Sequence, residues 1–185
     1  MKVEQSQVTK LVITGVERHD PIHVYLEDYG DNKNGRVTIS EWGDSWSCFW
    51  GSMGSSLIEF IQRINNHYWI GKLDSNLISE IDADNDANAE YAKKQVIKLR
   101  KDNEIDKYEA REYWDLIEAS DDVKDDCCNS FIGGKLLSLF GDDAWYNGWP
   151  TIPNHQYLRM ESRLNAVREA LKQISVNQVG ILTVD

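Results

Sequence analysis

The spacing of apolar residues changes at Gly54, and this change constrains the fold more than any other feature of the chain. Before Gly54, apolar and polar residues alternate, which is typical of strands with one buried face. Turn-forming pairs such as Asn34-Gly35 and Gly43-Asp44 separate the alternating runs. The sequence therefore predicts a four-stranded antiparallel meander over residues 1–54, with strands at 8–16, 22–27, 36–42 and 45–50.

Beyond Gly54, apolar residues recur about every 3.6 positions, as they do on one face of a helix. Ser56 with Glu59, and Asp106 with Glu109, have the spacing of a capping box, which marks the first turn of a helix. We expect helices over 55–65, over 88–101 and from 106 through 117, a short helical turn through Leu77, Ile78 and Ile81, one or two helices within 120–140, and an ordered aromatic loop over 141–153.

The last helix has the most regular pattern in the chain. Six apolar residues follow a 3-4-3-4-3 spacing, namely Tyr157, Met160, Leu164, Val167, Leu171 and Ile174. Because this seam covers fewer than three full heptads, we expect it to pack on its own domain rather than form a coiled-coil dimer. The tail over 176–185 is β-prone, so an extra edge strand, exchange between chains and a loose end all stay open.

These patterns together predict the α+β class, with a helical C-terminal two-thirds packed on the N-terminal meander. A chain of 185 residues is long enough to bury one core. We therefore expect a single domain over 1–185, mainly β over 1–54 and mainly α over 55–175.

The formal net charge is −11, and it is spread unevenly. Residues 74–126 contain 17 acidic and 8 basic side chains and so carry −9 of the total. Such a surface repels phosphate groups, so we expect no direct binding of nucleic acid and no binding to membranes. It attracts basic partners, including proteins that themselves bind nucleic acid. The alternative is a solvated surface that keeps the protein soluble. Because the chain has no signal-peptide pattern and no apolar run of ~18 residues, we expect a cytoplasmic protein.

The chain offers little support for a metal or a cofactor, and we expect neither. Cys48, Cys127 and Cys128 suit neither a disulfide framework nor a zinc or redox pair, and we interpret them as buried thiols. The segment 82–90 imitates the start of an EF-hand loop, but Ala87 stands at its glycine position and Lys93 at its closing glutamate. We interpret this segment as an acidic entry to a helix.

No nucleophile or phosphate-binding motif is present in the sequence, so we expect a protein that is not an enzyme. Trp46, Trp50 and Phe60 are expected in the core. Other aromatic residues lie in glycine-flanked surroundings, where a binding surface and a cover for the core are equally compatible with the pattern. The candidate partner-binding residues are Tyr68, Trp69, Trp145, Tyr146 and Trp149, together with Asp121, Asp122, Asp125 and Asp126.

Several short motifs in combination resemble a family of small accessory proteins of tailed phages and prophages of enteric bacteria. The motifs are Asp28-Tyr29-Gly30, Asn34-Gly35-Arg36-Val37, Ser45-Trp46, Trp50-Gly51-Ser52-Met53-Gly54, Phe60, Tyr68, Leu73, Arg111-Glu112 and the segment 153–171. The resemblance covers most of the chain and carries over no catalytic residues. It implies an accessory phage gene acting in the host cytoplasm, and such genes often encode inhibitors of host defence.

Our leading hypothesis is a phage or prophage protein, a monomer or a homodimer, that acts by binding a host protein. A specific version is an anti-defence inhibitor whose acidic helical surface occupies a basic, nucleic-acid-binding groove. The alternative is a small enzyme, or a protein that sequesters a small molecule or nucleotide, with a pocket around His67, Trp69, Trp145 and Trp149. A structural subunit of the phage particle is a third hypothesis.

Overall fold

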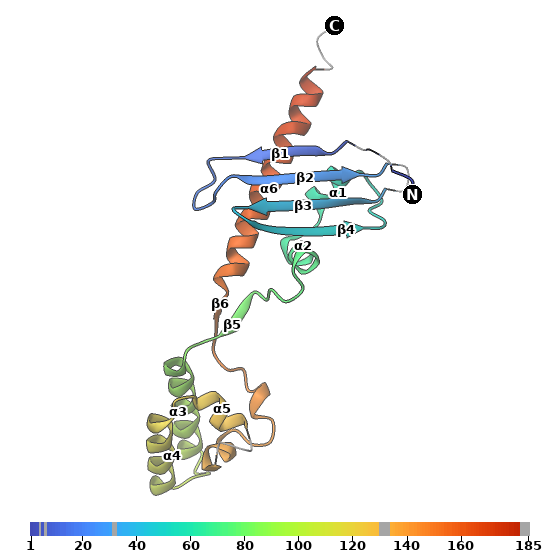
Figure 1. Cartoon of the computed structure of the whole chain (residues 1–185). Coiled ribbons are helices and arrows are strands. Elements are labelled where there is room, and N and C mark those ends of the chain that lie inside the picture. The colour runs from blue at the N-terminus through green and yellow to red at the C-terminus, as the bar shows by residue number, and fades with distance from the viewer. Residues whose placement is uncertain (4, 6, 31–32, 130–133, 182–185) are drawn as a thin grey trace. The chain divides into compact units, whose positions relative to one another are not determined.

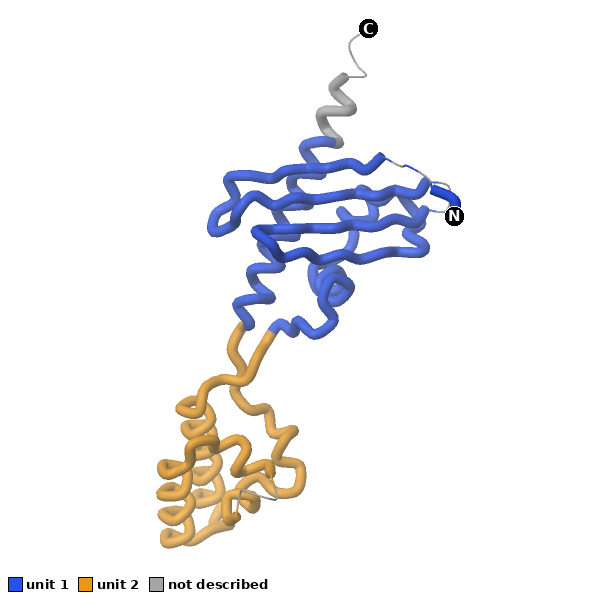
Figure 2. The backbone as a smooth tube through the Cα atoms, viewed as in Figure 1, with its two compact units in different colours: residues 1–79, 154–185 blue, residues 80–153 orange. Residues whose placement is uncertain are grey.

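The computed structural model describes residues 1–181 apart from 4, 6, 31–32 and 130–133, and of residues 175–181 it describes only the backbone. The chain forms two compact units (Figure 2). Unit 1 comprises residues 1–79 and 154–185, and unit 2 comprises residues 80–153. Unit 2 is thus an insertion in the sequence of unit 1. The single-domain expectation stays a prediction.

The sheet of unit 1 is the predicted meander, with strands in the order β1-β2-β3-β4, all antiparallel (Figure 1). The strands are β1 (Thr9–Ile13), β2 (Ile22–Asp28), β3 (Gly35–Glu41) and β4 (Asp44–Trp50). Alternation places Val24, Val37 and Ile39 on the buried face. The α+β class and the position of the sheet are confirmed.

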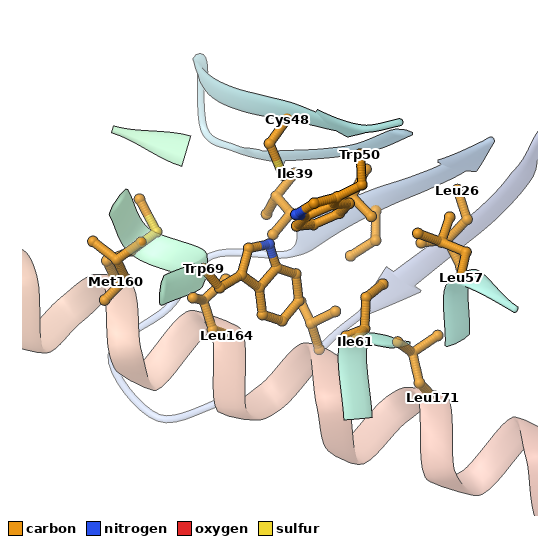
Figure 3. Packing of buried hydrophobic residues seen from close by; sticks show 14 of the residues in the cluster. Leu26, Ile39, Cys48, Trp50, Leu57, Ile61, Trp69, Met160, Leu164 and Leu171 are labelled. Carbon is orange, nitrogen blue, oxygen red and sulfur yellow. The ribbon is translucent and has the colours of Figure 1, made fainter. Parts of the chain in front are cut away.

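Three helices of unit 1 pack on the sheet around a shared core: α1 (Leu57–Arg63), α2 (Asn66–Leu73) and α6 (His155–Ile181). The capping box of Ser56 and Glu59 opens α1, as predicted. The seam of α6 is buried from Tyr157 to Leu171 in the core of unit 1 (Figure 3). This confirms the prediction that the helix packs within its own chain. Helix α6 extends through residues 176–181, so that part of the tail forms no edge strand, and residues 182–185 lie outside the described residues.

Helix α2 is an element that the sequence analysis did not predict, because Tyr68 and Trp69 were interpreted as loop-like. Asn65 caps it, since its Oδ1 accepts a hydrogen bond of 2.8 Å from the backbone N–H of Tyr68. Trp69 is fully buried and lies between the sheet and α6 (Figure 3). The helix is therefore stabilised by burial of this indole more than by its own short sequence.

Unit 2 has a hydrophobic core of its own. Its elements are β5 (Glu80–Asp82), α3 (Asn85–Lys101), α4 (Lys107–Ala119), α5 (Val123–Cys128), two 3₁₀ turns η1 (Gly134–Leu139) and η2 (Ala144–Tyr146), and β6 (Thr151–Pro153). The capping box of Asp106 and Glu109 opens α4, as predicted.

Strands β5 and β6 pair antiparallel at the two ends of unit 2, with Ile81 opposite Ile152. The helical turn that we predicted through Leu77, Ile78 and Ile81 is therefore wrong, because Ile81 lies in β5 and pairs with a residue of β6 that is distant in the sequence. The predicted helices within 120–140 correspond to α5 and η1. Gly134, at the predicted break, begins η1, and Gly133 lies outside the described residues.

Candidate functional site

A buried carboxylate at the end of β3 is the centre of the densest polar network described in unit 1. Alternation along β3 turns the side chain of Glu41 toward α6, and Glu41 is only 3% exposed. Arg159 and Arg163 lie one helical turn apart on α6 and therefore face the same side. Arg163 donates to Oε2 from Nε at 2.7 Å and also from Nη2, while Arg159 Nη2 donates to Oε1 at 3.0 Å.

The loop between β1 and β2 supplies two more donors to this carboxylate. His19 Nδ1 and the backbone N–H of Asp20 each lie 3.1 Å from Oε1 of Glu41. On the other side of the ring, His19 Nε2 lies 3.1 Å from the hydroxyl of Ser162 on α6. The network thus ties together a loop, a strand end and a helix that are distant in the sequence.

The charge of Glu41 depends on the balance between burial and these donors. Burial raises the pKa of the carboxyl group, but hydrogen bonds from Arg163, Arg159 and His19 outweigh it and lower the pKa to about 2. Glu41 is therefore ionised at neutral pH, and the two arginines remain paired with it. The guanidinium of Arg163 also lies over the ring of Trp46, 4.2 Å from its centroid.

Beside this network lies a cavity of about 600 Å³, open to solvent on one side, which we call the Trp42 groove. Its wall comes from α6, from the end of α2 and from the hairpin of β3 and β4. Residues lining it include Asp20, Glu41, Trp42, Asp44, Trp46, Asp74, Gln156 and Arg159. The indole of Trp42 stands at the hairpin turn and is 88% exposed.

Trp42 occupies a backbone conformation that a bulky residue rarely adopts. It is the first residue of the two-residue connection between β3 and β4, and its φ is 60°. Glycine or asparagine is the usual residue at such a position. A tryptophan there costs ~1–3 kcal/mol, and such a conformation persists only where the surrounding structure enforces it. Trp42 thus combines a strained backbone with an exposed indole at the groove.

The electrostatics of the groove favour a cation. Asp20, Asp44 and Asp74 line it, and none of them forms an ion pair with a described residue. The lining has four carboxylates, including Glu41, and two arginines, so its net charge is −2. An indole face together with unpaired carboxylates suits a guanidinium or ammonium group, which gains both cation–π and ion-pair contacts.

The candidate aromatic residues differ in how far they are exposed to solvent. Trp69 and Trp149 are core residues, with 0% and 6% exposure, so our expectation that they belong to a binding surface is corrected in favour of their role in the core. Tyr68 is 40% exposed, and its hydroxyl accepts a hydrogen bond from Trp50 Nε1. Trp145 and Tyr146 are exposed, as a binding surface requires.

The acidic candidates gather at the start of α5. Asn85, the first residue of α3, bonds through its side chain to Ser120 and Val123, and so brings the N-termini of α3 and α5 together. Lys124 lies 2.6 Å from Asp82 and 5.8 Å from the ring centroid of Trp145. We call this surface the acidic end of unit 2, comprising Asp82, Asp84, Asp86, Asp121, Asp122, Asp125 and Asp126 around Lys124.

Part of this acidity has a local explanation, because carboxylates stabilise the N-terminus of a helix. Asp84 caps α3, and Asp122 caps α5 by accepting a hydrogen bond from the backbone N–H of Asp125. Asp126 accepts a hydrogen bond of 2.6 Å from the hydroxyl of Ser120. These hydrogen bonds explain why single positions hold an aspartate. The excess of negative charge remains, and it acts on any partner that approaches the surface.

The residues expected to line the pocket of the alternative hypothesis are divided between the two units, so this pocket stays a prediction. His67 and Trp69 belong to unit 1, while Trp145 and Trp149 belong to unit 2. His67 Nδ1 lies 3.2 Å from the hydroxyl of Tyr157, and the two buried indoles present no open face. Trp69 is buried in the core of unit 1, and Trp149 is buried in the core of unit 2.

The thiols are placed for packing rather than chemistry. Burial raises the pKa of Cys48 and of Cys127 to about 12, and it also raises the pKa of Cys128. Within the described ranges, no group of three His, Cys, Asp or Glu side chains is placed to hold a metal ion. Among the described helices, none combines the length and the apolarity needed to cross a membrane.

The sequence analysis missed Trp42, Glu41 and Arg163. A signal for Trp42 was present, since a tryptophan precedes Gly43 at a two-residue hairpin turn where glycine or asparagine is expected. Glu41 has the same alternation phase as Val37 and Ile39, which predicts an inward carboxylate. Its two arginine partners could not be deduced, because they lie 118 and 122 residues away in the chain.

A model of the family Phage_phiTE_072, described as a phage family, matches residues 1–173. No curated protein and no solved structure matches the chain.

Proposed function

The chain belongs to the phage protein family Phage_phiTE_072, and we propose that it is an accessory protein that acts by binding a basic partner protein and not by catalysis. The Trp42 groove carries this proposal. In it, an exposed indole stands beside carboxylates that have no described ion-pair partner. The membership agrees with the resemblance to phage proteins found in the sequence. The enteric host and the accessory role are parts of the proposal.

We assign to the groove an arginine or lysine side chain of the partner. The cationic head of such a side chain lies over the face of Trp42, and Asp44 and Asp74 accept its hydrogen bonds. A cation over tryptophan contributes ~0.5–2 kcal/mol, depending on how far the pair is removed from water. The Glu41 network holds the wall of the groove in one geometry, so little ordering is needed on binding.

The partner class that fits best is a host protein that itself binds nucleic acid, as an anti-defence inhibitor would require. Such proteins present basic grooves, and a net charge of −11 steers them toward this chain. The carboxylates at the acidic end of unit 2 add to this attraction. The same charge disfavours direct binding of nucleic acid or of anionic membranes.

The test is an affinity pull-down of the tagged protein from a nuclease-treated lysate of a phage-susceptible bacterium, analysed by mass spectrometry. Trp42→Asn removes the indole while keeping a residue that tolerates positive φ, so the variant folds. The double variant D44N/D74N removes two charges and keeps the oxygen acceptors. Trp145→Ser is the matched control, since it removes an exposed indole from unit 2.

We expect one basic protein to be captured by the wild type and by Trp145→Ser, and to be reduced about tenfold with each groove variant. Its retention should fall steeply between low and high salt. Equal retention at both salt concentrations contradicts the electrostatic part of the proposal. Loss with Trp145→Ser and retention with Trp42→Asn would move the binding surface to unit 2. If the wild type enriches no protein, the proposal fails.

A further inference from the structure

A second groove lies in unit 2, between α3 and α4, and its character is the opposite of that of the Trp42 groove. It has a volume of about 520 Å³ and an apolar floor, which includes buried Val96, half-exposed Ile97 and Trp114. Tyr108, at its edge, is 83% exposed. Four aromatic or aliphatic side chains thus face one channel along two adjacent helices, and this channel we call the α3–α4 groove.

Every charged residue that lines the α3–α4 groove is basic: Arg100, Lys101, Lys107 and Arg111. Arg111 pairs with Asp115 at 3.0 Å, but the other three form no ion pair with any described residue. This cluster lies within residues 74–126, a segment that carries −9 overall. The cations are therefore concentrated at the groove against the general charge of the unit.

Helix stability explains only some of these cations. Arg100 and Lys101 lie in the last turn of α3, where positive charge is favourable because helix C-termini carry a partial negative charge. Lys107 is the first residue of α4, and at that end a cation is unfavourable. Its position therefore needs another explanation, and a negatively charged occupant of the groove provides one.

We propose that the α3–α4 groove binds an amphipathic helix of a partner protein, with the apolar face of that helix flanked by aspartate and glutamate. A helix laid along two adjacent helices buries apolar side chains at i, i+3, i+4 and i+7, which suits an elongated apolar floor. Its flanking carboxylates meet Arg100, Lys101 and Lys107. Nucleic acid fits less well, because residues 74–126 carry a net charge of −9 and repel phosphate groups.

This site is independent of the proposed function, which rests on unit 1 and on a basic partner. A chain with both sites can hold two proteins of opposite charge. The two proposals are tested with different variants and different probes, so each can fail alone.

The probe is a set of three helical peptides with one fixed leucine face, flanked on both sides by glutamate, by glutamine or by lysine. Binding of each peptide to the full chain is measured by fluorescence anisotropy. We expect the glutamate peptide to bind about tenfold more tightly than the glutamine peptide, and the lysine peptide to bind least. Equal affinities for the three peptides overturn the charge complementarity.

Lys107→Glu is the decisive variant, and Lys98→Glu is its matched control. Both residues are exposed lysines of unit 2, and Lys98 does not line the groove. A glutamate at position 107 suits the N-terminus of α4, so this variant is expected to fold at least as well as the wild type. Lys107→Glu should lower the affinity for the glutamate peptide about tenfold, whereas Lys98→Glu should lower it less than twofold.

Ile97→Ser tests the apolar floor and should weaken all three peptides. Three results overturn the proposal: equal loss with Lys107→Glu and Lys98→Glu, binding that survives Ile97→Ser, or tighter binding of a DNA oligonucleotide than of the glutamate peptide. Analytical ultracentrifugation adds a fourth. Self-association of the wild type that Lys107→Glu abolishes would assign the groove to a second copy of the chain.

Discussion

At the scale of single residues, neighbours in the chain have opposite environments. Glu41 is buried and fully bonded, whereas Trp42, the next residue, is 88% exposed at positive φ. The buried carboxylate holds α6 against the end of β3, and the exposed indole borders the groove that results. The strain at Trp42 is sustained because the Glu41 network fixes the preceding residue.

Substitution of Glu41 by glutamine tests this network. We expect the free energy of unfolding to fall by about 3 kcal/mol at neutral pH, because the change leaves Arg163 buried without a counter-charge. Lowering the pKa from 4.5 to about 2 corresponds to a similar free energy. Urea unfolding, followed by amide NMR signals of β2 and β3, measures the loss.

The pH dependence has a definite sign, because the pKa of Glu41 is lower in the folded state than in the unfolded state. Its contribution is present above the unfolded value and is lost as pH falls from about 4.5 to about 2. The wild type and E41Q should therefore converge over that window. Asp44→Asn, at an exposed carboxylate without a described ion pair, should change stability little. If the difference in free energy of unfolding between the wild type and E41Q stays constant over this window, the lowered pKa of Glu41 is contradicted.

At the scale of elements, the regular patterns were predicted and the short elements were not. The seam of α6 and the capping boxes of α1 and α4 follow from local spacing alone, and the structure confirms them. Helix α2 and strand β5 depend on partners elsewhere in the chain. Trp69 is buried by the sheet and α6, and Ile81 pairs with Ile152.

Leu164→Ala tests the seam as an internal contact. Leu164 is fully buried, so truncation should lower the free energy of unfolding by about 2–5 kcal/mol. Leu158→Ala, in the same helix at 45% exposure, should change it far less. Urea unfolding, followed by the amide NMR signals of unit 1, measures the stability of both variants. A midpoint that depends on protein concentration would instead indicate that the seam joins two chains.

At the scale of the whole molecule, unit 2 is inserted into unit 1 at a closed backbone junction. The N–H of Asn154 donates to the carbonyl of Ser79 at 2.9 Å, so the two ends of unit 1 are adjacent. Each unit has its own hydrophobic cluster. Adjacent ends and separate cores are the conditions under which an inserted unit can be removed.

Replacing residues 80–153 by a short glycine–serine linker should therefore leave unit 1 folded. We expect the amide signals of β2 and β3 to keep their chemical shifts and their protection from hydrogen exchange. The complementary fragment 80–153 should keep the protection of α3. Loss of protection in the linker variant would mean that unit 1 depends on unit 2 and that the chain folds as the single domain predicted from its sequence.

The sequence by itself determined the sheet, its meander order, the longer helices and the excess of acidic charge. These depend on residue spacing of a few positions and on composition, both of which are local properties. The phage family also follows from the chain alone.

Only the tertiary structure decided which aromatic residues are exposed, and of the two alternatives left open for Trp69 and Trp149 it selected the core. It also decided that Glu41 meets Arg163, 122 residues away, and that cations gather over an apolar floor between α3 and α4. Burial and charge pairing depend on which distant segments meet. No local pattern encodes that, because similar glycine-flanked aromatic segments can cover a core or face solvent.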